Sequence, residues 1–222
     1  MPLALVTGAA GALGGDVARA LAQRGDSVAL LDRPESRARL DALAAEIAHG
    51  ATVHVALDEL RGRPIELAAL VAGGWAGGTP LYEAKDDTAY RAMMESNVDT
   101  VYFALRALLP GMVARKRGSI VIVGSRNVER PWTGKGSAAY TASKHAAVAL
   151  AQTAAAEVVE YGVRINAIMP STMDTRANRA SMPKADFTKW VTTASAAGVI
   201  AFLLSDAARD VSGAAIPIYG RA

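Results

Sequence analysis

Cysteine is absent from this chain of 222 residues. Its absence excludes a disulfide-stapled fold and any thiolate-bound zinc or iron–sulfur site. Long apolar runs are absent too: no uncharged stretch reaches the about 18 residues that a membrane helix needs, so we expect no membrane partner. Histidine is scarce, and His49, His54 and His145 lack partners at ligand spacing, so we expect no metal site.

A strong excess of one charge is also missing. The formal net charge is only +3, and basic and acidic residues are interspersed along the chain, which argues against nucleic acid as a partner. By contrast, 51% of the residues are hydrophobic, enough for a large core in one domain spanning 1–222. The N-terminal residues 1–6 lack a basic region and run into a glycine-rich loop, so we interpret them as a strand rather than a signal peptide and expect a cytoplasmic protein.

Short apolar runs alternate with longer helical stretches from one end of the chain to the other. This alternation predicts an α/β fold: one Rossmann-type, doubly wound parallel sheet of about seven strands with helices on both faces. The expected strands are Leu3–Thr7, Ser27–Leu31, Thr52–Leu57, Leu67–Ala72, Ser119–Val123, Arg164–Met169 and Ala215–Tyr219. The expected helices are Gly14–Arg24, Glu35–His49, Asp86–Ala114, Ala138–Tyr161 and Ala194–Leu204.

The third crossover is unusually short. Only residues 58–66 separate the third and fourth expected strands, whereas a parallel crossover normally needs about a dozen residues or more, usually as a helix. Either the crossover helix is missing or one strand is misplaced. We favour the missing helix, because Gly62 and Pro64 both oppose a helix there.

The first expected strand ends in a loop of small residues, Thr7–Gly15, and a helix follows. Such a loop lets the backbone approach a pyrophosphate at the positive end of the helix, although a glycine-rich turn alone is a weak signal. Asp32 ends the second strand 18 residues after Gly14, close to the spacing of about 20 expected for a ribose-binding acid. Its carboxylate favours NAD(H), while the neighbouring Arg33 leaves NADP(H) open.

A second candidate site lies in the second half of the chain. Tyr140 and Lys144 are four residues apart, which places them on one face of the expected helix, and Ser125 ends the fifth strand. A Tyr hydroxyl exchanges protons poorly at neutral pH, but an ammonium at about 4 Å would lower its pKa by roughly three units, to near 7. Ser125 can donate a second hydrogen bond to the same substrate oxygen. The three residue types therefore suit hydride transfer between a nicotinamide cofactor and a carbonyl or alcohol.

Together these motifs resemble the short-chain dehydrogenase/reductase family over essentially the whole chain. The resemblance implies catalytic roles for Asn97, Ser125, Tyr140 and Lys144. It also implies that Tyr140 and Lys144 contact the cofactor together with Gly8, Gly11, Ala12, Leu13, Gly14, Asp32, Arg33, Asp58, Ala72, Gly73, Pro170, Met173 and Thr175.

The chain departs from the family pattern at three places. Ser125 and Tyr140 lie 15 residues apart, more than is usual, with 129–136 filling the gap. The usual Asn-Asn-Ala-Gly after the fourth strand is replaced by the residues at 71–74. The absence of the third crossover helix removes part of the expected adenine wall around Asp58.

Two segments resemble a narrower branch, the quinonoid dihydropteridine reductases. They are Val71–Gly78 and Thr172–Phe187. That branch keeps the Tyr/Lys pair but not the Ser and Asn, which this chain has. A carbonyl or alcohol substrate is therefore the first hypothesis, a quinonoid pterin the alternative, and a non-catalytic dinucleotide sensor a third.

Aromatic residues near the carboxyl edge of the sheet suggest a substrate pocket. We expect Trp75 and Trp132 to line it together with Ser125 and Tyr140, although tryptophans more often seal loops onto a core. The long mixed segment at about 171–193 suits a lid over the substrate.

The helices that carry Asn97 and Tyr140 are apolar on more than one face, as is typical of helices buried on two sides. In the family these helices form a dimer contact. The resemblance therefore implies a homodimer or homotetramer acting on a small molecule.

Overall fold

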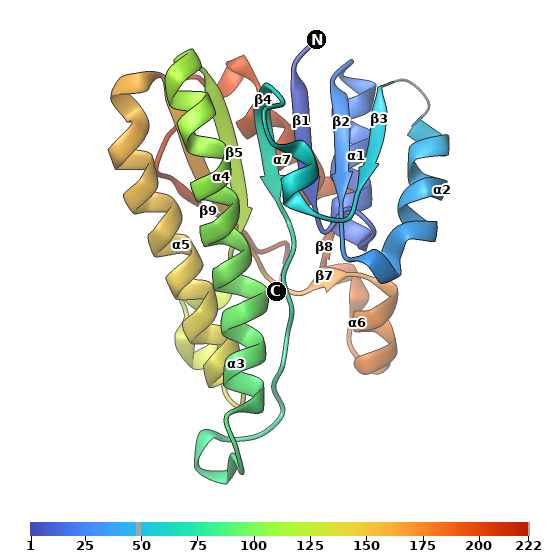
Figure 1. Ribbon diagram of the computed structural model, residues 1–222. Helices are drawn as coiled ribbons and strands as arrows, with labels where there is room; N and C mark the ends of the chain where they lie inside the picture. Colours follow the sequence, from blue (N-terminus) through green and yellow to red (C-terminus); the bar gives the residue numbers. More distant parts are fainter. Residues whose placement is uncertain (48–49, 222) are drawn as a thin grey trace.

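The computed structural model describes residues 1–47 and 50–221, and the end of the helix expected at Glu35–His49 lies outside them. Its centre is a seven-stranded sheet in the order β3-β2-β1-β4-β5-β6-β9, with every neighbouring pair parallel (Figure 1). The strands are β1 (Leu3–Thr7), β2 (Ser27–Leu31), β3 (Ala51–His54), β4 (Ile65–Leu70), β5 (Gly118–Val123), β6 (Val163–Pro170) and β9 (Ala215–Ile218). This confirms the doubly wound α/β fold.

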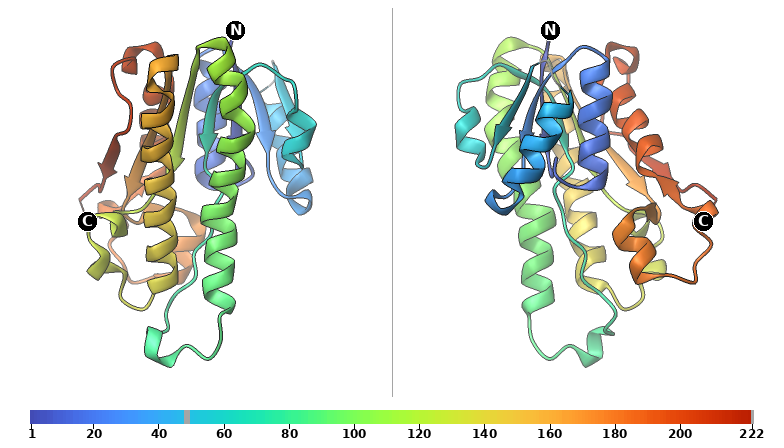
Figure 2. Two further views of the ribbon diagram at one scale, coloured as in Figure 1. Left: turned by 60° about the vertical axis from the view of Figure 1, so that its left-hand side comes forward. Right: turned by 90° about the vertical axis from the view of Figure 1, so that its right-hand side faces the viewer.

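Helices cover both faces of the sheet (Figure 2). One face packs against α1 (Ala12–Gln23), α2 (Arg37–Ile47) and α7 (Thr193–Leu204), and the other against α4 (Thr100–Arg115) and α5 (Ala138–Val158). The central strands are buried on both sides, which explains why their sequences are nearly continuous in apolar residues. Each face has its own core, represented by Leu21 and Ile200 on the first and by Met112 and Ile120 on the second.

The third crossover contains no α-helix, as the sequence predicts. Residues 55–64 join β3 to β4 through a single 3-10 turn, Leu57–Leu60, whose Leu60 is 4% exposed and packs into the core beneath α4. The strands around it differ from the expected runs, because β3 ends at His54 and β4 already begins at Ile65. Leu60, together with the partly buried Leu57, therefore packs against the core from a crossover that usually contains a helix.

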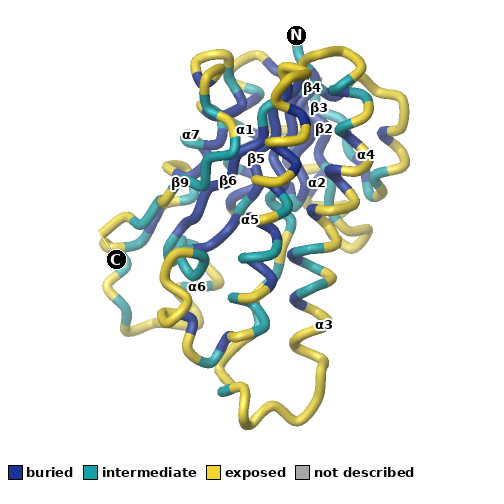
Figure 3. The backbone as a smooth tube through the Cα atoms, turned by 90° about the vertical axis from the view of Figure 1, so that its left-hand side faces the viewer, coloured by how far each residue is buried: buried dark blue, intermediate teal, exposed yellow. Residues whose placement is uncertain are grey.

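The long helix expected at Asp86–Ala114 is interrupted. It comprises α3 (Thr88–Met94), a π-helical turn at Glu95–Asp99, and α4. A π turn inserts one residue into the helical repeat, and such turns are frequent at functional sites. Figure 3 shows α3 and the connection before it extending away from the sheet as a largely exposed protrusion.

The segment after β6 is ordered around a second, two-stranded sheet. β7 (Met173–Asp174) pairs parallel with β8 (Val191–Thr192), and α6 (Arg176–Ser181) lies between them in sequence. Further 3-10 helices are Pro34–Ser36, Leu81–Glu83, Arg126–Val128, Pro131–Gly134, Val159–Tyr161, Phe187–Lys189 and Asp206–Ala208. Within 1–47 and 50–221, none of the helices has the length and apolarity needed to traverse a bilayer.

Candidate active site

The glycine loop after β1 has the shape of a phosphate cradle. Gly8 has a φ of +66°, and a Cβ there would lie 2.8 Å from the backbone nitrogen of Ala72. A Cβ on Gly14 would collide with the carbonyl of Gly8, so both positions require glycine. Helix α1 begins at Ala12 and has no side-chain cap on its first N–H groups. These donors and the helix dipole fit the pyrophosphate of a dinucleotide.

Asp32 follows β2 and lies next to this loop. Its Oδ2 accepts a hydrogen bond from the Ala10 backbone nitrogen at 3.0 Å, and its Oδ1 accepts one from the Arg33 nitrogen at 2.8 Å. A hollow of about 410 Å³ borders the glycine loop and is also lined by Arg39. The structure therefore brings Asp32 to the glycine loop, as the sequence predicts, and Arg39 lines the hollow beside that loop.

Asp58 lies apart from this group. It belongs to the 3-10 turn of the short crossover, its side chain is 86% exposed, and it pairs with Arg61 at 3.1 Å. The expectation that Asp58 contacts the adenine has no support from this position. At the end of β3 stands His54 instead, which bonds to Thr52 and Glu59.

The connection after β4 links the cofactor side to the catalytic side. The Ala72 nitrogen donates to Thr7 Oγ1 at 3.1 Å. A Cβ on Gly73 would lie 2.7 Å from Asn97 Oδ1 and 3.2 Å from Lys144 Nζ. The backbone at Gly73 therefore passes directly against two predicted catalytic side chains.

Asn97 lies in the π-helical turn and is 1% exposed. Its Oδ1 accepts from the Gly74 nitrogen at 2.9 Å, and its Nδ2 donates to the Gly74 carbonyl at 3.1 Å and to Ser143 Oγ at 3.0 Å. Ser143 in turn donates to the Tyr140 carbonyl. Asn97 thus ties the β4–α3 connection to the turn of α5 that carries Tyr140 and Lys144.

Ser125 and Tyr140 meet at the carboxyl end of β5. Ser125 is 6% exposed, and its Oγ accepts a hydrogen bond from the Asn127 nitrogen. Burial raises the pKa of Tyr140 above its ordinary value, and a hydrogen bond with the Ser125 side chain partly offsets that rise. The phenol is therefore protonated at neutral pH in this arrangement.

Lys144 lies deeper, on the same face of α5. Its Nζ donates to the Val123 carbonyl at 2.8 Å and lies 6.0 Å from the centroid of the Tyr140 ring. Burial lowers the pKa of Lys144 to about 8. The expectation that Lys144 brings the pKa of Tyr140 to near 7 is wrong for this geometry. Burial raises that pKa, and the hydrogen bond with Ser125, rather than the ammonium 6.0 Å from the ring centroid, is the group that lowers it.

The extended loop between Ser125 and Tyr140 is held from within. Asn127 Nδ2 donates to Thr141 Oγ1 at 3.0 Å, and Thr133 donates to Asn127 Oδ1. Both predicted pocket tryptophans are exposed, Trp132 by 73% and Trp75 by 66%. They therefore do not seal loops onto the core.

The segment after β6 holds the remaining predicted cofactor residues. Pro170 is the last residue of β6 and Met173 lies in β7. Thr175 caps α6, with its Oγ1 accepting from the Asn178 nitrogen at 3.1 Å. Ser171 donates to the Tyr219 carbonyl at 2.8 Å and so fixes this segment to the end of β9.

Tyr219 and Glu129 form a contact that the sequence does not reveal. The Tyr219 hydroxyl donates to Glu129 Oε2 at 2.5 Å, and Arg130 lies over the Tyr219 ring at 5.2 Å. Burial and the Glu129 carboxylate raise the pKa of Tyr219 to about 12. Ninety positions separate the two partners, so no local pattern could have indicated the pair.

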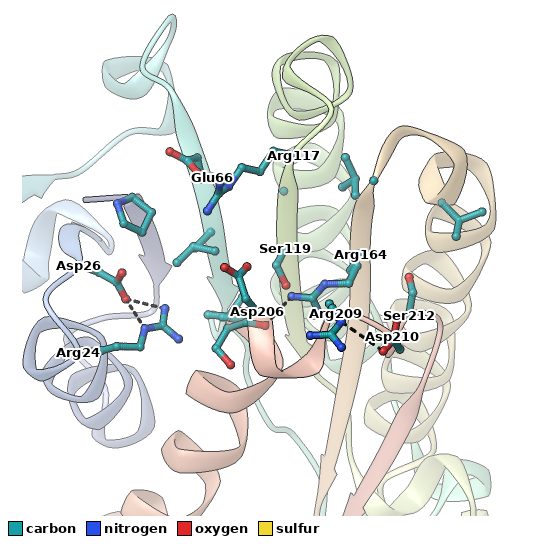
Figure 4. A pocket seen from close by; sticks show the side chains of 18 residues that line it. Arg24, Asp26, Glu66, Arg117, Ser119, Arg164, Asp206, Arg209, Asp210 and Ser212 are labelled. Carbon is teal, nitrogen blue, oxygen red and sulfur yellow. Dashed lines mark hydrogen bonds and ion pairs between the residues drawn. The ribbon is translucent and has the colours of Figure 1, made fainter.

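A larger cavity of about 520 Å³ lies at the opposite, amino edge of the sheet (Figure 4). Its arginines are matched by acids or carbonyls: Arg24 pairs with Asp26, Arg117 with Glu66, and Arg164 donates to three backbone carbonyls. The predicted catalytic residues lie at the other edge. Across 1–47 and 50–221, the structure shows no group of three or more residues able to hold a metal ion.

Comparison with known proteins gives a consistent result. A family model described as short chain dehydrogenase matches residues 2–186. Galactitol 2-dehydrogenase (L-tagatose-forming) of Cereibacter sphaeroides is 32% identical over 98% of this chain and 93% of its own length.

Two solved structures extend the comparison. An NAD⁺-bound xylitol dehydrogenase has a TM-score of 0.87 and 26% identity, covering 99% of this chain and 98% of the other. A protein of Beutenbergia cavernae with bound NADP, provisionally named NAD(P)-dependent gluconate 5-dehydrogenase, has a TM-score of 0.88 and 28% identity, covering 99% and 95%.

Proposed function

The chain belongs to the short-chain dehydrogenase family, and we propose that Tyr140 is the general acid/base of its NAD(P)-dependent reaction on an alcohol or carbonyl group. The observation that carries this proposal is the convergence of Ser125, Tyr140, Lys144 and Asn97 at the carboxyl edge of β5. Ligands bind at this edge in open parallel sheets.

Each catalytic side chain has a distinct task. In reduction, the Tyr140 hydroxyl donates its proton to the substrate oxygen, and in oxidation the phenolate takes the proton back. Ser125 donates a second hydrogen bond to that oxygen. Lys144 would favour the phenolate by its charge and would hold the nicotinamide ribose, while Asn97 positions the α5 turn. A nicotinamide held there would provide the hydride chemistry that the protein side chains lack.

The cofactor preference we propose is NAD(H). Asp32 supports it, because its carboxylate stands where adenosine ribose hydroxyls would bind and would repel a 2′-phosphate. The glycine loop at Gly8, Gly11, Ala12, Leu13 and Gly14 would hold the pyrophosphate, and Pro170, Met173 and Thr175 the nicotinamide. Arg33 and Arg39 are the residues that would accept NADP(H) as a second cofactor.

We propose a secondary alcohol of a polyol, or the matching ketose, as the substrate class. Support comes from the similar proteins described above, a galactitol 2-dehydrogenase and a xylitol dehydrogenase. The exposed Trp75 and Trp132 would border the substrate, and the segment at about 171–193 would cover it. A homodimer or homotetramer and a cytoplasmic location stay predictions.

A quinonoid pterin is the second candidate substrate. The observation that favours it is Trp75, which is 66% exposed and whose ring lies close to Gly77 beside Ser137, three residues before Tyr140. An exposed indole at this place offers a flat surface on which a pterin ring could stack.

The first experiment is a turnover assay with NADH and NADPH in parallel. The acceptors are ketoses and a quinonoid dihydropterin, and NAD⁺ with alditols gives the reverse reaction. Tyr140→Phe is the control: it should bind NADH like the wild type and lose turnover. Full activity of this variant would contradict the proposal. Tight NADH binding with no turnover of any alcohol, carbonyl or pterin would instead support a dinucleotide sensor.

A further inference from the structure

One cation near the catalytic serine has no use in the mechanism above. Arg126 directly follows Ser125 and begins the 3-10 turn Arg126–Val128. Its Nε atom is buried, and no hydrogen-bond partner for it occurs in the part of the chain that the structure describes. The residue as a whole stays partly exposed, so a solute can still reach it. A buried guanidinium nitrogen without an acceptor is costly for a folded protein.

No described residue near Arg126 accepts a hydrogen bond from its Nε. Glu129 is the next acid along the chain, but its carboxylate accepts a hydrogen bond from the Tyr219 hydroxyl. Arg130 adds a second positive charge over the Tyr219 ring. The positive charges of Arg126 and Arg130 both lower the pKa of Tyr219, against the larger rise caused by burial and Glu129. Arg126, Glu129 and Arg130 together carry a formal charge of +1, in the loop that begins at the catalytic Ser125.

We propose that Arg126 binds an anionic group of the substrate, a carboxylate or a phosphate, so that the preferred substrates are acidic polyols rather than neutral ones. This inference rests on the proposed polyol function and narrows it. A guanidinium presents paired N–H donors that match the oxygens of both groups. Arg126 is the chain neighbour of Ser125, so we place its anion partner on the same substrate molecule whose oxygen Ser125 would hold.

The contact between Glu129 and Tyr219 would position Arg126 for this role. It joins the loop after Ser125 to the end of β9, and Ser171 fixes the backbone of Tyr219 from the other side. Glu129 is occupied by a neutral hydroxyl instead of an arginine, which leaves Arg126 available to an incoming anion. Glu129 and Tyr219 are thus positioning residues and need not touch the substrate.

The test compares substrates of the same carbon chain that carry either a neutral or an anionic group at one end. D-Glucitol is neutral, D-gluconate carries a carboxylate on the same six-carbon chain, and D-glucitol 6-phosphate carries a phosphate. Shorter pairs of aldonates and alditols extend the series. We expect kcat/KM to be about 10- to 100-fold higher for the acids, the gain expected of a hydrogen bond to a charged group. The two anionic arms show which group is bound.

Substitution at Arg126 supplies the second half of the test. Arg126→Gln should remove the preference by raising KM for the acids, with kcat for a neutral alditol unchanged, and Arg126→Lys should restore part of it. Arg209→Gln is the matched control, because Arg209 is exposed at the opposite edge of the sheet. Tyr219→Phe should weaken the preference without abolishing turnover.

Several outcomes would overturn the inference while leaving the proposed function intact. They are equal turnover of acids and alditols, equal loss for both in Arg126→Gln, or a change of oligomeric mass in that variant, which would assign Arg126 to a subunit contact. If neither class is turned over, the polyol function fails. Calorimetric titration of the NAD⁺ complex with D-gluconate and inorganic phosphate then decides: binding lost in Arg126→Gln supports the inference, and absence of binding overturns it.

Discussion

The two edges of the central sheet treat their cations differently. At the amino edge, Arg24 and Arg117 pair with acids, and Arg164 donates to the carbonyls of Leu203, Ser205 and Val211 (Figure 4). At the carboxyl edge, Lys144 is buried and donates to the Val123 carbonyl, and Arg126 Nε finds no acceptor within residues 1–47 and 50–221. The first edge uses its charges to hold the fold together. The second keeps them available at the expense of stability, as is typical of sites that bind and react.

Removing the buried ammonium at the carboxyl edge should have the largest effect. We expect Lys144→Met to lower kcat/KM by about 10³-fold. Burial already raises the pKa of Tyr140. Loss of the Lys144 charge should therefore shift the pH at which the rate of alcohol oxidation increases to a still higher value. A pH–rate profile from pH 6 to 10 measures both effects. An unchanged profile would show that Lys144 does not act on Tyr140.

Ser125→Ala should have the next largest effect, and it separates the two candidate substrates. Removing one donor to a developing oxyanion costs roughly 10²-fold in kcat. We therefore expect this loss with ketoses, whereas reduction of a quinonoid pterin should change little. Steady-state kinetics with both acceptors make the comparison. A small effect on ketose reduction would remove Ser125 from the mechanism.

Arg164→Gln tests the amino edge. This change removes the Arg164 donor from the carbonyls of Leu203 and Ser205 at the end of α7, and leaves Leu203 with only the hydrogen bond from Ser119 Oγ among the described residues. We expect the free energy of unfolding to fall by about 2–3 kcal/mol, with kcat of the folded enzyme unchanged. Urea denaturation measures the loss, and Arg209→Gln serves as the exposed control. If Arg164→Gln lowered kcat without lowering the free energy of unfolding, the amino edge would also contribute to catalysis, and the contrast between the two edges would be wrong.

Lys144→Met should have the opposite effect on stability. The lowered pKa of Lys144 means that its charge opposes folding below about pH 8, and this opposition fades between pH 8 and the ordinary value of 10.5. The shift corresponds to about 3 kcal/mol, of which the lost bond to Val123 removes about 1–2 kcal/mol. We expect a net gain of about 1–2 kcal/mol at pH 7 that shrinks at higher pH. Urea denaturation at pH 7 and pH 10 measures this difference. A lower free energy of unfolding for Lys144→Met than for the wild type at pH 7 would contradict the prediction.

The smallest effect should come from Asp58→Asn. The Asp58 carboxylate is exposed and pairs only with the exposed Arg61 among the described residues. We expect NADH affinity and stability to stay within about twofold and 0.5 kcal/mol of the wild type. Fluorescence titration with NADH measures the affinity, with Asp32→Asn as the sensitive comparison. A large loss of NADH affinity in Asp58→Asn would show that Asp58 contacts the adenine after all.

Much of this arrangement is predictable from the sequence because it depends on local patterns. Apolar runs mark the strands, and Gly62 and Pro64 indicate the shortened crossover. The spacing of Tyr140 and Lys144 places them on one helix face. The distance between the Tyr140 ring and Lys144 Nζ and the burial of both residues are not predictable from that spacing. For this reason the expectation of a lowered Tyr140 pKa is wrong, and burial raises it.

Other features depend on tertiary contacts that no local pattern reports. A single inserted residue in the helical repeat produces the π turn around Asn97, and apolar periodicity cannot detect it. The bond between Tyr219 and Glu129 joins distant segments. The exposure of Trp75 and Trp132 depends on how two loops leave the sheet.

The short crossover at 55–64 also has a consequence for folding. It connects the two parts of the central sheet, β1 to β3 on one side and β4, β5, β6 and β9 on the other. The entropy lost on closing a loop grows with its length, so a crossover twice as long would cost about 0.6 kcal/mol more. The ten-residue tether raises the effective concentration of each half for the other, which favours early pairing of β4 with β1 in the order of assembly.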